Sequence, residues 1–226
     1  MPDQQRFIFL QGCFLLFSFA ALWVFSPVGG PLDLSLIKPW MNESGGFPLR
    51  NAWALAELNH RWVKNLLIGA YALMLLQWLV AFKYAPFKAQ RFELGYFFFS
   101  AMLCTAAVGI LKSQSAHAGP WSMTAAAPHG FLWDFQAEKG HCFPGGHASA
   151  GFALMTGYFA YRLSQPKKAF FYLGSGLILG FAMGWAQMMR GAHFLSHNLW
   201  TAWVVWCINA AVYALTYRHF AQRTQR

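Results

Sequence analysis

The chain has 226 residues, of which 57% are hydrophobic and only 11% are charged. Soluble globular domains carry about 25% charged residues, so this composition argues against a water-soluble protein and indicates one embedded in a membrane. A net charge of +10 would also suit a nucleic-acid-binding protein. The basic residues, however, are scattered between apolar segments and form no contiguous patch, so we expect no nucleic-acid partner.

Apolar segments are the dominant pattern along the chain, and a helix needs about 20 residues to cross the hydrocarbon core of a bilayer. The first segment has no clear small-x-small cleavage site after it, so we interpret it as an uncleaved span. The predicted fold class is all-α: a polytopic membrane protein with about six transmembrane helices. The expected spans are 7–25, 65–82, 96–111, 148–163, 169–188 and 199–217.

The predicted domain organisation is a single integral-membrane domain, residues 1–226, with a motif-bearing core at about 95–217. More of the 17 Lys and Arg residues lie in the loops on the side of the termini than on the other side. Because cytoplasmic loops are enriched in basic residues, we expect both termini inside and the two long loops, 26–64 and 112–146, outside.

The third expected span ends at Lys112, on the predicted outer side. A lysine at a span end commonly extends its ammonium group to the interface. The same ammonium group is also a suitable point charge for a phosphoryl group.

Histidines are concentrated on the predicted outer side, where all of them except His219 fall. For His60, His117 and His129, placement in a polar loop is a sufficient explanation. The other notable histidines lie at or just inside span ends, where ionisable groups are costly and tend to mark function. They are His147, His193 and His197.

The fourth span opens with Pro144-Gly145-Gly146-His147. Glycines let the backbone approach a ligand closely, and the free N–H groups of a first helical turn favour an anion. Two glycines alone would equally suit a flexible turn before a helix. The cationic groups expected nearby favour a phosphate-type cradle at Gly145 and Gly146, with His147 beside it as a proton carrier.

The segment from Gln187 to Asn198 joins the fifth and sixth spans. If it is helical, Arg190, His193 and His197 share one face, because residues three and four apart are neighbours. If Gly191 breaks the helix, the same three residues still gather at one junction.

A histidine pair four residues apart is also a metal-ligand spacing. No glutamate follows His193 as metalloprotease chemistry requires, and the outer acids Asp134 and Glu138 are distant in sequence. We therefore expect no metal ion.

These motifs resemble those of the type 2 phosphatidic acid phosphatase superfamily of membrane lipid phosphatases. Its pattern runs Lys-x6-Arg-Pro, then Pro-Ser-Gly-His, then Ser-Arg-x5-His-x3-Asp. In this chain Lys112 stands six residues before Gly119-Pro120, the second block is Pro144-Gly145-Gly146-His147, and His193 takes the position of the third-block histidine. The resemblance covers the latter half of the chain, and the six-span layout agrees with it.

The chain departs from the family pattern at four positions. Arg190, one turn after Gln187, is a candidate for the missing cation. His197 or Asn198 is a candidate for the orienting role of the aspartate, through a hydrogen bond. The replacements are Gly119 for the first arginine, Gly145 for the serine, Gln187 for the second arginine and His197 for the aspartate.

The resemblance implies a metal-independent, two-step phosphoryl transfer without a cofactor. His193 would be the nucleophile and form a phosphohistidine, and His147 would protonate the leaving oxygen. The phosphate oxygens would be held by Lys112, Arg190, Gln187 and the N–H groups around Gly145 and Gly146. The substrate would be a lipid phosphate: undecaprenyl pyrophosphate, a phosphatidate-type lipid or a lipid A phosphate. The site would face the periplasm from a bacterial inner membrane, in contact with membrane lipids.

Three alternatives stay open at this point. A phosphotransferase would use the same site but pass the phosphoryl group to a second lipid. A non-catalytic binder or transporter of lipid phosphates would explain the departures, although it needs no proton donor opposite a nucleophile. A scaffold with incidental histidines would be unaffected by His147→Ala or His193→Ala. The particular lipid and the oligomeric state are also open.

Overall fold

Long helices dominate the computed structural model, which describes residues 2–137 and 140–224; among the side chains left undescribed is that of His60. Five helices in this described part are long and apolar enough to cross a membrane. The all-α polytopic fold class is therefore confirmed. These helices are α1 (Pro2–Phe25), α3 (Lys64–Val80) with the π-helical segment η2 (Ala54–Val63) leading into it, α5 (Arg91–Gln114), α8 (Pro166–Met189) and α9 (Leu195–Thr224).

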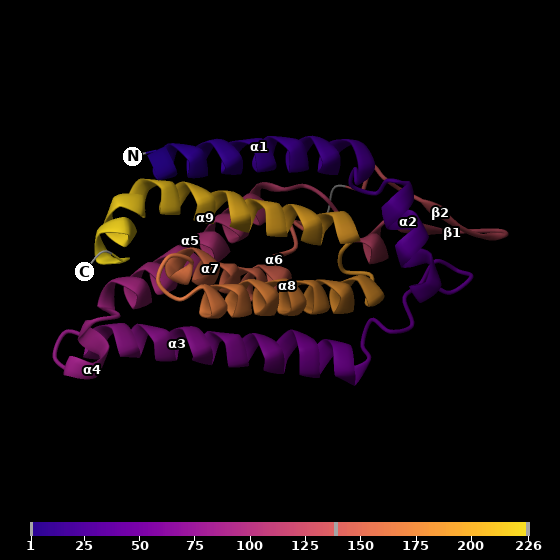
Figure 1. Cartoon of the computed structure of the whole chain (residues 1–226). Helices are drawn as coiled ribbons and strands as arrows, with labels where there is room; N and C mark the ends of the chain where they lie inside the picture. The colour runs from indigo at the N-terminus through magenta and orange to yellow at the C-terminus, as the bar shows by residue number, and fades with distance from the viewer. Residues whose placement is uncertain (1, 138–139, 225–226) are drawn as a thin grey trace.

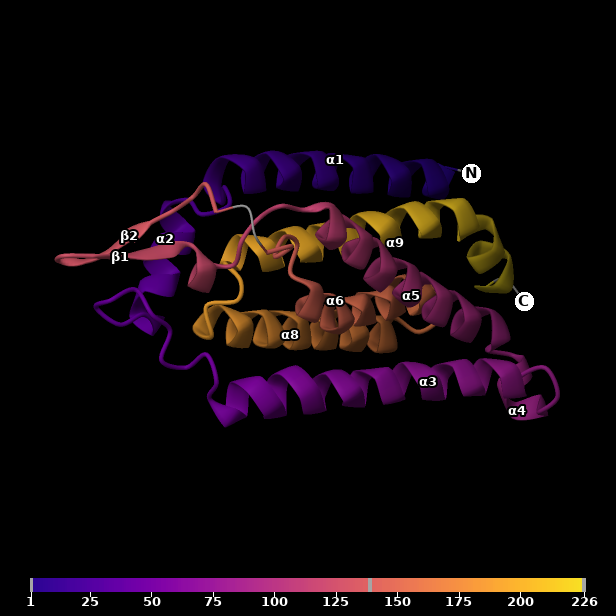
Figure 2. The same ribbon diagram turned by 180° about the vertical axis from the view of Figure 1, so that it is seen from behind.

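The fourth expected span is divided into three short helical pieces. They are α6 (Gly146–Phe152), the 3₁₀ turn η4 (Ala153–Met155) and α7 (Thr156–Tyr161). The backbones of α6 and α8 touch, since a Cβ atom placed on Gly151 would lie 2.6 Å from the Gly180 nitrogen. This close packing places α6 and α7 among the longer helices, with the start of α6 directed toward the end of the molecule that lies away from the termini (Figures 1 and 2).

The two ends of the helical bundle differ in character. Both termini lie at one end, with the short helix α4 (Ala85–Lys88) between α3 and α5 (Figure 1). The other end, called the loop end here, holds the two long loops. They contain α2 (Pro31–Ile37), η1 (Lys38–Trp40), η3 (Pro120–Ser122) and an antiparallel hairpin of β1 (Thr124–Ala127) and β2 (Gly130–Trp133). Termini at the same end agree with an even number of crossings.

An apolar cluster holds the loop end together. Ile37 and Phe47 from the first long loop pack with Met123 from the second and with Met188 and Phe194 from the α8–α9 junction. Burial of several such side chains, each worth about 1.5–3 kcal/mol, fixes both loops over the ends of α8 and α9. The loops therefore form a structured cover on this end of the bundle.

Candidate functional site

The candidate site forms where α8 ends and α9 begins. Gly191 has a φ of +78°, which a glycine adopts readily, and it stops α8 after Met189. His193 consequently lies in the connection, whereas His197 lies in the first turn of α9. Of the two arrangements expected from the sequence, the structure has the broken helix, and it still brings both histidines together.

His193 and His197 form a buried pair. Their Nδ1 atoms are 3.2 Å apart, and the exposed fractions of the two residues are 3% and 0%. One nitrogen must donate and the other accept, so the contact selects complementary tautomers. His197 thus contacts the nucleophile candidate directly, as an orienting group must.

The environment of His193 disfavours its protonated form. Burial lowers the pKa of His193 well below its ordinary value of 6.5, and the neighbouring His197 and Lys112 lower it further. His193 is therefore a neutral imidazole at neutral pH. In the tautomer in which its Nδ1 donates to His197, the lone pair lies on Nε2.

His147 and Lys112 complete the group from two further helices. The ring centroids of His147, in the first turn of α6, and His193 are 6.5 Å apart. The Lys112 ammonium lies against the start of α6, because a Cβ atom on Gly146 would be 3.4 Å from its Nζ. Residues from α5, α6 and the α8–α9 junction therefore converge on one location.

Gly145 does not contribute in the way its sequence position suggested. Its N–H donates to the carbonyl oxygen of His197 at 3.1 Å, and its own carbonyl oxygen accepts from the Thr201 hydroxyl at 3.1 Å. The Gly145 N–H is thus already used and is not free for a phosphate oxygen. Gly145 fastens α6 to α9, which leaves Gly146 as the glycine of the expected cradle.

Asn198 is a packing residue rather than a partner of His193. Its side chain lies between two glycines, since Cβ atoms on Gly145 and Gly184 would come 2.6 and 2.5 Å from its atoms. Its Nδ2 donates to the Phe194 carbonyl oxygen at 3.3 Å. Of the two candidates for the orienting role, His197 is the one in hydrogen-bond contact with His193.

Arg190 and Gln187 lie together at the end of α8. The Arg190 guanidinium donates to the Gln187 Oε1 at 3.2 Å and to the Arg50 carbonyl oxygen at 2.8 Å. The Arg50 guanidinium in turn lies 4.2 Å from the ring centroid of Trp121. Arg190 therefore joins the first long loop to the site, and its phosphate-binding role stays a prediction.

Sequence reasoning missed Asp33 of α2, which is only 1% exposed. Its Oδ1 accepts from the Ser196 N–H at 2.9 Å, and its Oδ2 accepts from the Ser196 hydroxyl at 2.5 Å and the Gly29 N–H at 2.9 Å. A carboxylate here caps the N-terminus of α9, one turn from both histidines of the pair. The sequence gives one signal for this role, which is a single acidic residue in an apolar stretch. It does not reveal the partner, because Ser196 is 163 residues away along the chain.

A metal site was not expected from the sequence. Within the described residues, no group of three or more His, Cys, Asp or Glu side chains is placed to hold a metal ion. Whether the activity is independent of metal ions stays a prediction to be tested with a chelator.

The fold and the site define the protein as a helical membrane protein with a histidine-centred, lysine-flanked site at one end of the bundle. Residues 93–221 match the family model of the PAP2 superfamily, so the chain belongs to this superfamily. Its members are typically phosphatases that act on phosphate esters, often those of lipids. The match contains Lys112, His147 and His193 but not α1 to α4. No curated protein and no solved structure matches the chain.

Proposed function

We propose that the protein is a lipid phosphatase that hydrolyses a phosphomonoester or pyrophosphate of a lipid at His193. The observation that carries this proposal is the buried His193–His197 pair, 3.2 Å apart, in a chain of the PAP2 superfamily. A neutral, oriented imidazole is the form that a histidine nucleophile needs. Undecaprenyl pyrophosphate, a phosphatidate-type lipid and a lipid A phosphate are the candidate substrates.

In the first step, the His193 Nε2 attacks phosphorus while its Nδ1–H donates to the Nδ1 of His197. The bond between phosphorus and the leaving oxygen breaks, and His147 protonates that oxygen as it leaves. The leaving oxygen belongs to the lipid alcohol in a phosphomonoester and to the lipid monophosphate in a pyrophosphate. Lys112 and the backbone at Gly146 stabilise the negative charge on the transferring phosphoryl group. The products of this step are a phosphohistidine on His193 and the lipid alcohol or, from a pyrophosphate, the lipid monophosphate.

In the second step, water attacks the phosphorus of the phosphohistidine and His147 accepts its proton. The P–N bond breaks, inorganic phosphate leaves and His193 becomes neutral again. A lipid hydroxyl or phosphate in place of water would make the reaction a phosphotransfer, with the same residues in the same roles.

The first experiment is phosphate release by the purified protein in detergent, with a chelator present, on the three candidate lipids. His193→Ala should reduce release at least about 1,000-fold, because no other group forms the covalent intermediate. The matched control is His219→Ala, since His219 is exposed in α9 near the termini and should not affect release. Release that survives His193→Ala would refute the mechanism, and binding without release would favour the non-catalytic binder.

The proposed location is a bacterial inner membrane with the site on the periplasmic side. The excess of basic residues near the termini supports this orientation. Reporter fusions in the 112–146 loop should show that the loop end is periplasmic. A cytoplasmic loop would overturn the orientation without affecting the histidine chemistry.

A further inference from the structure

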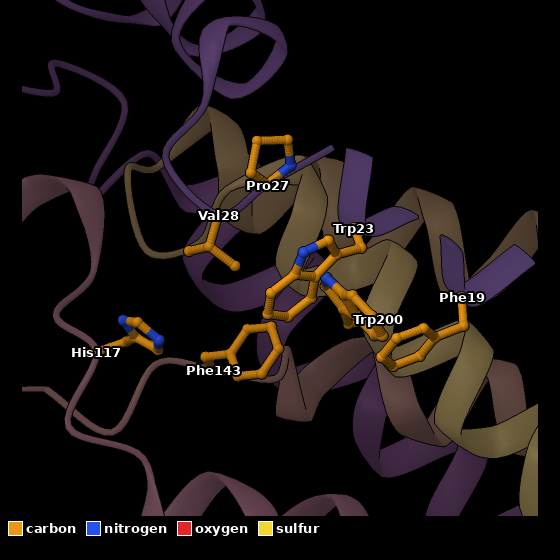
Figure 3. A pocket seen from close by; sticks show the side chains of 7 residues that line it. All are labelled: Phe19, Trp23, Pro27, Val28, His117, Phe143 and Trp200. Carbon is orange, nitrogen blue, oxygen red and sulfur yellow. The ribbon is translucent and has the colours of Figure 1, made fainter. Parts of the chain in front are cut away.

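Two cavities at opposite ends of the bundle differ in the charge of their walls. The cavity beside the histidine site, of about 560 Å³, is lined by aromatic and aliphatic side chains and by His117 (Figure 3). The other cavity, of about 450 Å³, lies at the end that holds the termini and is called the basic cavity here. Three cations line it, namely Lys88 of α4, Arg91 of α5 and Arg223 of α9.

Two of these three cations keep an unbalanced charge. Arg223 is matched by Glu93, since its Nε donates to Oε1 at 3.1 Å and its Nη2 donates to Oε2 at 3.4 Å. Lys88 and Arg91 form no salt bridge with an Asp or Glu of the described chain. The Arg91 guanidinium is held over an aromatic ring, 4.8 Å from the ring centroid of Phe82. The basic cavity therefore presents two positive charges to an anion.

The basic cavity also has an aromatic wall. Trp78 contacts two phenylalanine rings, with centroid distances of 5.2 Å to Phe82 and 5.0 Å to Phe99. Its indole rests on Gly95, where a Cβ atom would lie 2.5 Å from the Trp78 Nε1. Phe82 and Phe99 are 53% and 51% exposed. Because α3 and α5 are long and apolar enough to cross a membrane, these exposed rings face hydrocarbon chains rather than water.

The cations and the deepest ring lie at different levels of the membrane. Arg91 begins α5, and Phe99 follows it by roughly 12 Å along the helix at about 1.5 Å per residue. The polar headgroup layer on each side of a bilayer is roughly 6 Å thick. With Arg91 at the headgroup level, Phe99 therefore lies at the depth of the hydrocarbon chains. A phospholipid has the same order, with its phosphate at the surface and its chains below.

We propose that the basic cavity binds an anionic phospholipid, with its phosphate at Lys88 and Arg91 and a hydrocarbon chain against the aromatic wall. Basic pockets between membrane helices suit anionic headgroups. A zwitterionic lipid is less favourable, because it brings its own cation to two that are already unpaired. The aromatic wall favours a lipid over a soluble phosphate. The basic cavity lies at the opposite end from His193, so its ligand is independent of the proposed reaction.

Titration of lipids into the purified protein in neutral detergent tests the assignment. The probes are dioleoyl phosphatidylglycerol, which is anionic, and dioleoyl phosphatidylcholine, which has the same chains and no net charge. The double variant Lys88→Gln/Arg91→Gln should weaken the Kd of phosphatidylglycerol about 25-fold, since each Lys or Arg near an anionic lipid contributes about fivefold. The matched control is Lys83→Gln/Arg218→Gln, which removes one exposed Lys and one exposed Arg that do not line the cavity. It should change that Kd less than about twofold.

The comparison of ligands and variants decides between a defined lipid site and general attraction. Wild-type protein should bind phosphatidylglycerol more tightly than phosphatidylcholine, and inorganic phosphate should not displace the bound lipid. Equal affinity for the two lipids, or equal weakening in the two double variants, would overturn the assignment. Displacement by inorganic phosphate would overturn it in favour of a soluble anion. These measurements need no phosphate release, so failure of the proposed function would not affect their outcome.

Discussion

The carboxylate of Asp33 offers the sharpest test of how the site is held in place. Asp33→Ala leaves three donors without their acceptor, two on Ser196 and one on Gly29. A buried donor left unsatisfied costs about 1–3 kcal/mol, and loss of a helix N-cap costs about 0.5–2 kcal/mol. Because these contributions overlap, we expect a total loss of roughly 3–5 kcal/mol in the free energy of unfolding.

Asp33→Asn should have a smaller effect. Burial raises the pKa of Asp33 above its ordinary value even though its hydrogen bonds lower it, so the buried charge carries a net desolvation cost. Asparagine removes this cost and keeps one oxygen acceptor, whereas its amide group faces a donor. We expect Asp33→Asn to lower the free energy of unfolding by roughly 1–2 kcal/mol.

Thermal unfolding of the purified protein in detergent measures both variants. At about 2–4 °C per kcal/mol for a chain of this size, Asp33→Ala should lower Tm by about 10 °C. The control is Asp134→Ala, because Asp134 accepts an N–H from Gln136 at 3.0 Å but is exposed. It should shift Tm by less than about 2 °C. Equal shifts in the Asp33 and Asp134 variants would refute the capping argument.

Three further predictions concern the site and its frame. The low pKa of His193 places the acid limb of kcat/KM below the ordinary histidine range, and Lys112→Gln should move this limb to higher pH, because it removes one positive charge that lowers the pKa. Gly145→Ser restores the residue of the family pattern but brings a Cβ atom within 2.6 Å of Asn198. It should lower the free energy of unfolding by about 1–3 kcal/mol, seen as a lower Tm, and adding Asn198→Ala should recover part of that loss. Gly191→Ala should lower the free energy of unfolding by at least about 1–2 kcal/mol, because Gly191 has a φ of +78°. The control is Gly174→Ala in α8, where a Cβ atom meets no other atom, and it should not lower the free energy of unfolding.

The helices and the histidine pair were predictable because their signals are local. Apolar length predicted the long helices, and the expected 96–111 span lies inside α5 at Arg91–Gln114. The spacing of His193 and His197 predicted their contact for either shape of the junction. The break of the fourth span was not predictable, because it accompanies backbone contact with Gly180 rather than any change in apolar composition.

The features that sequence could not supply depend on distant pairs. The Asp33 carboxylate accepts a hydrogen bond from the Ser196 N–H, and the Gly145 N–H donates to the His197 carbonyl oxygen of α9. The contact between α1 and α9 likewise joins the first and last long helices of the described chain, and Trp203 of α9 donates to the Leu15 carbonyl oxygen of α1 (Figures 1 and 2). Hydrophobic periodicity reports which face of a helix is apolar, but not which other helix meets it.

The glycines that replace family residues have a common physical reason. A Cβ atom on Gly119 would lie 2.7 Å from the Ala192 carbonyl oxygen, and one on Gly145 would lie 2.6 Å from Asn198. The segments that carry the three motifs therefore cross too closely for the arginine and serine of the pattern. Fewer side chains are then available at these positions to hold a phosphate, so in the proposed reaction binding depends more strongly on Lys112 and on backbone N–H groups than the family pattern implies.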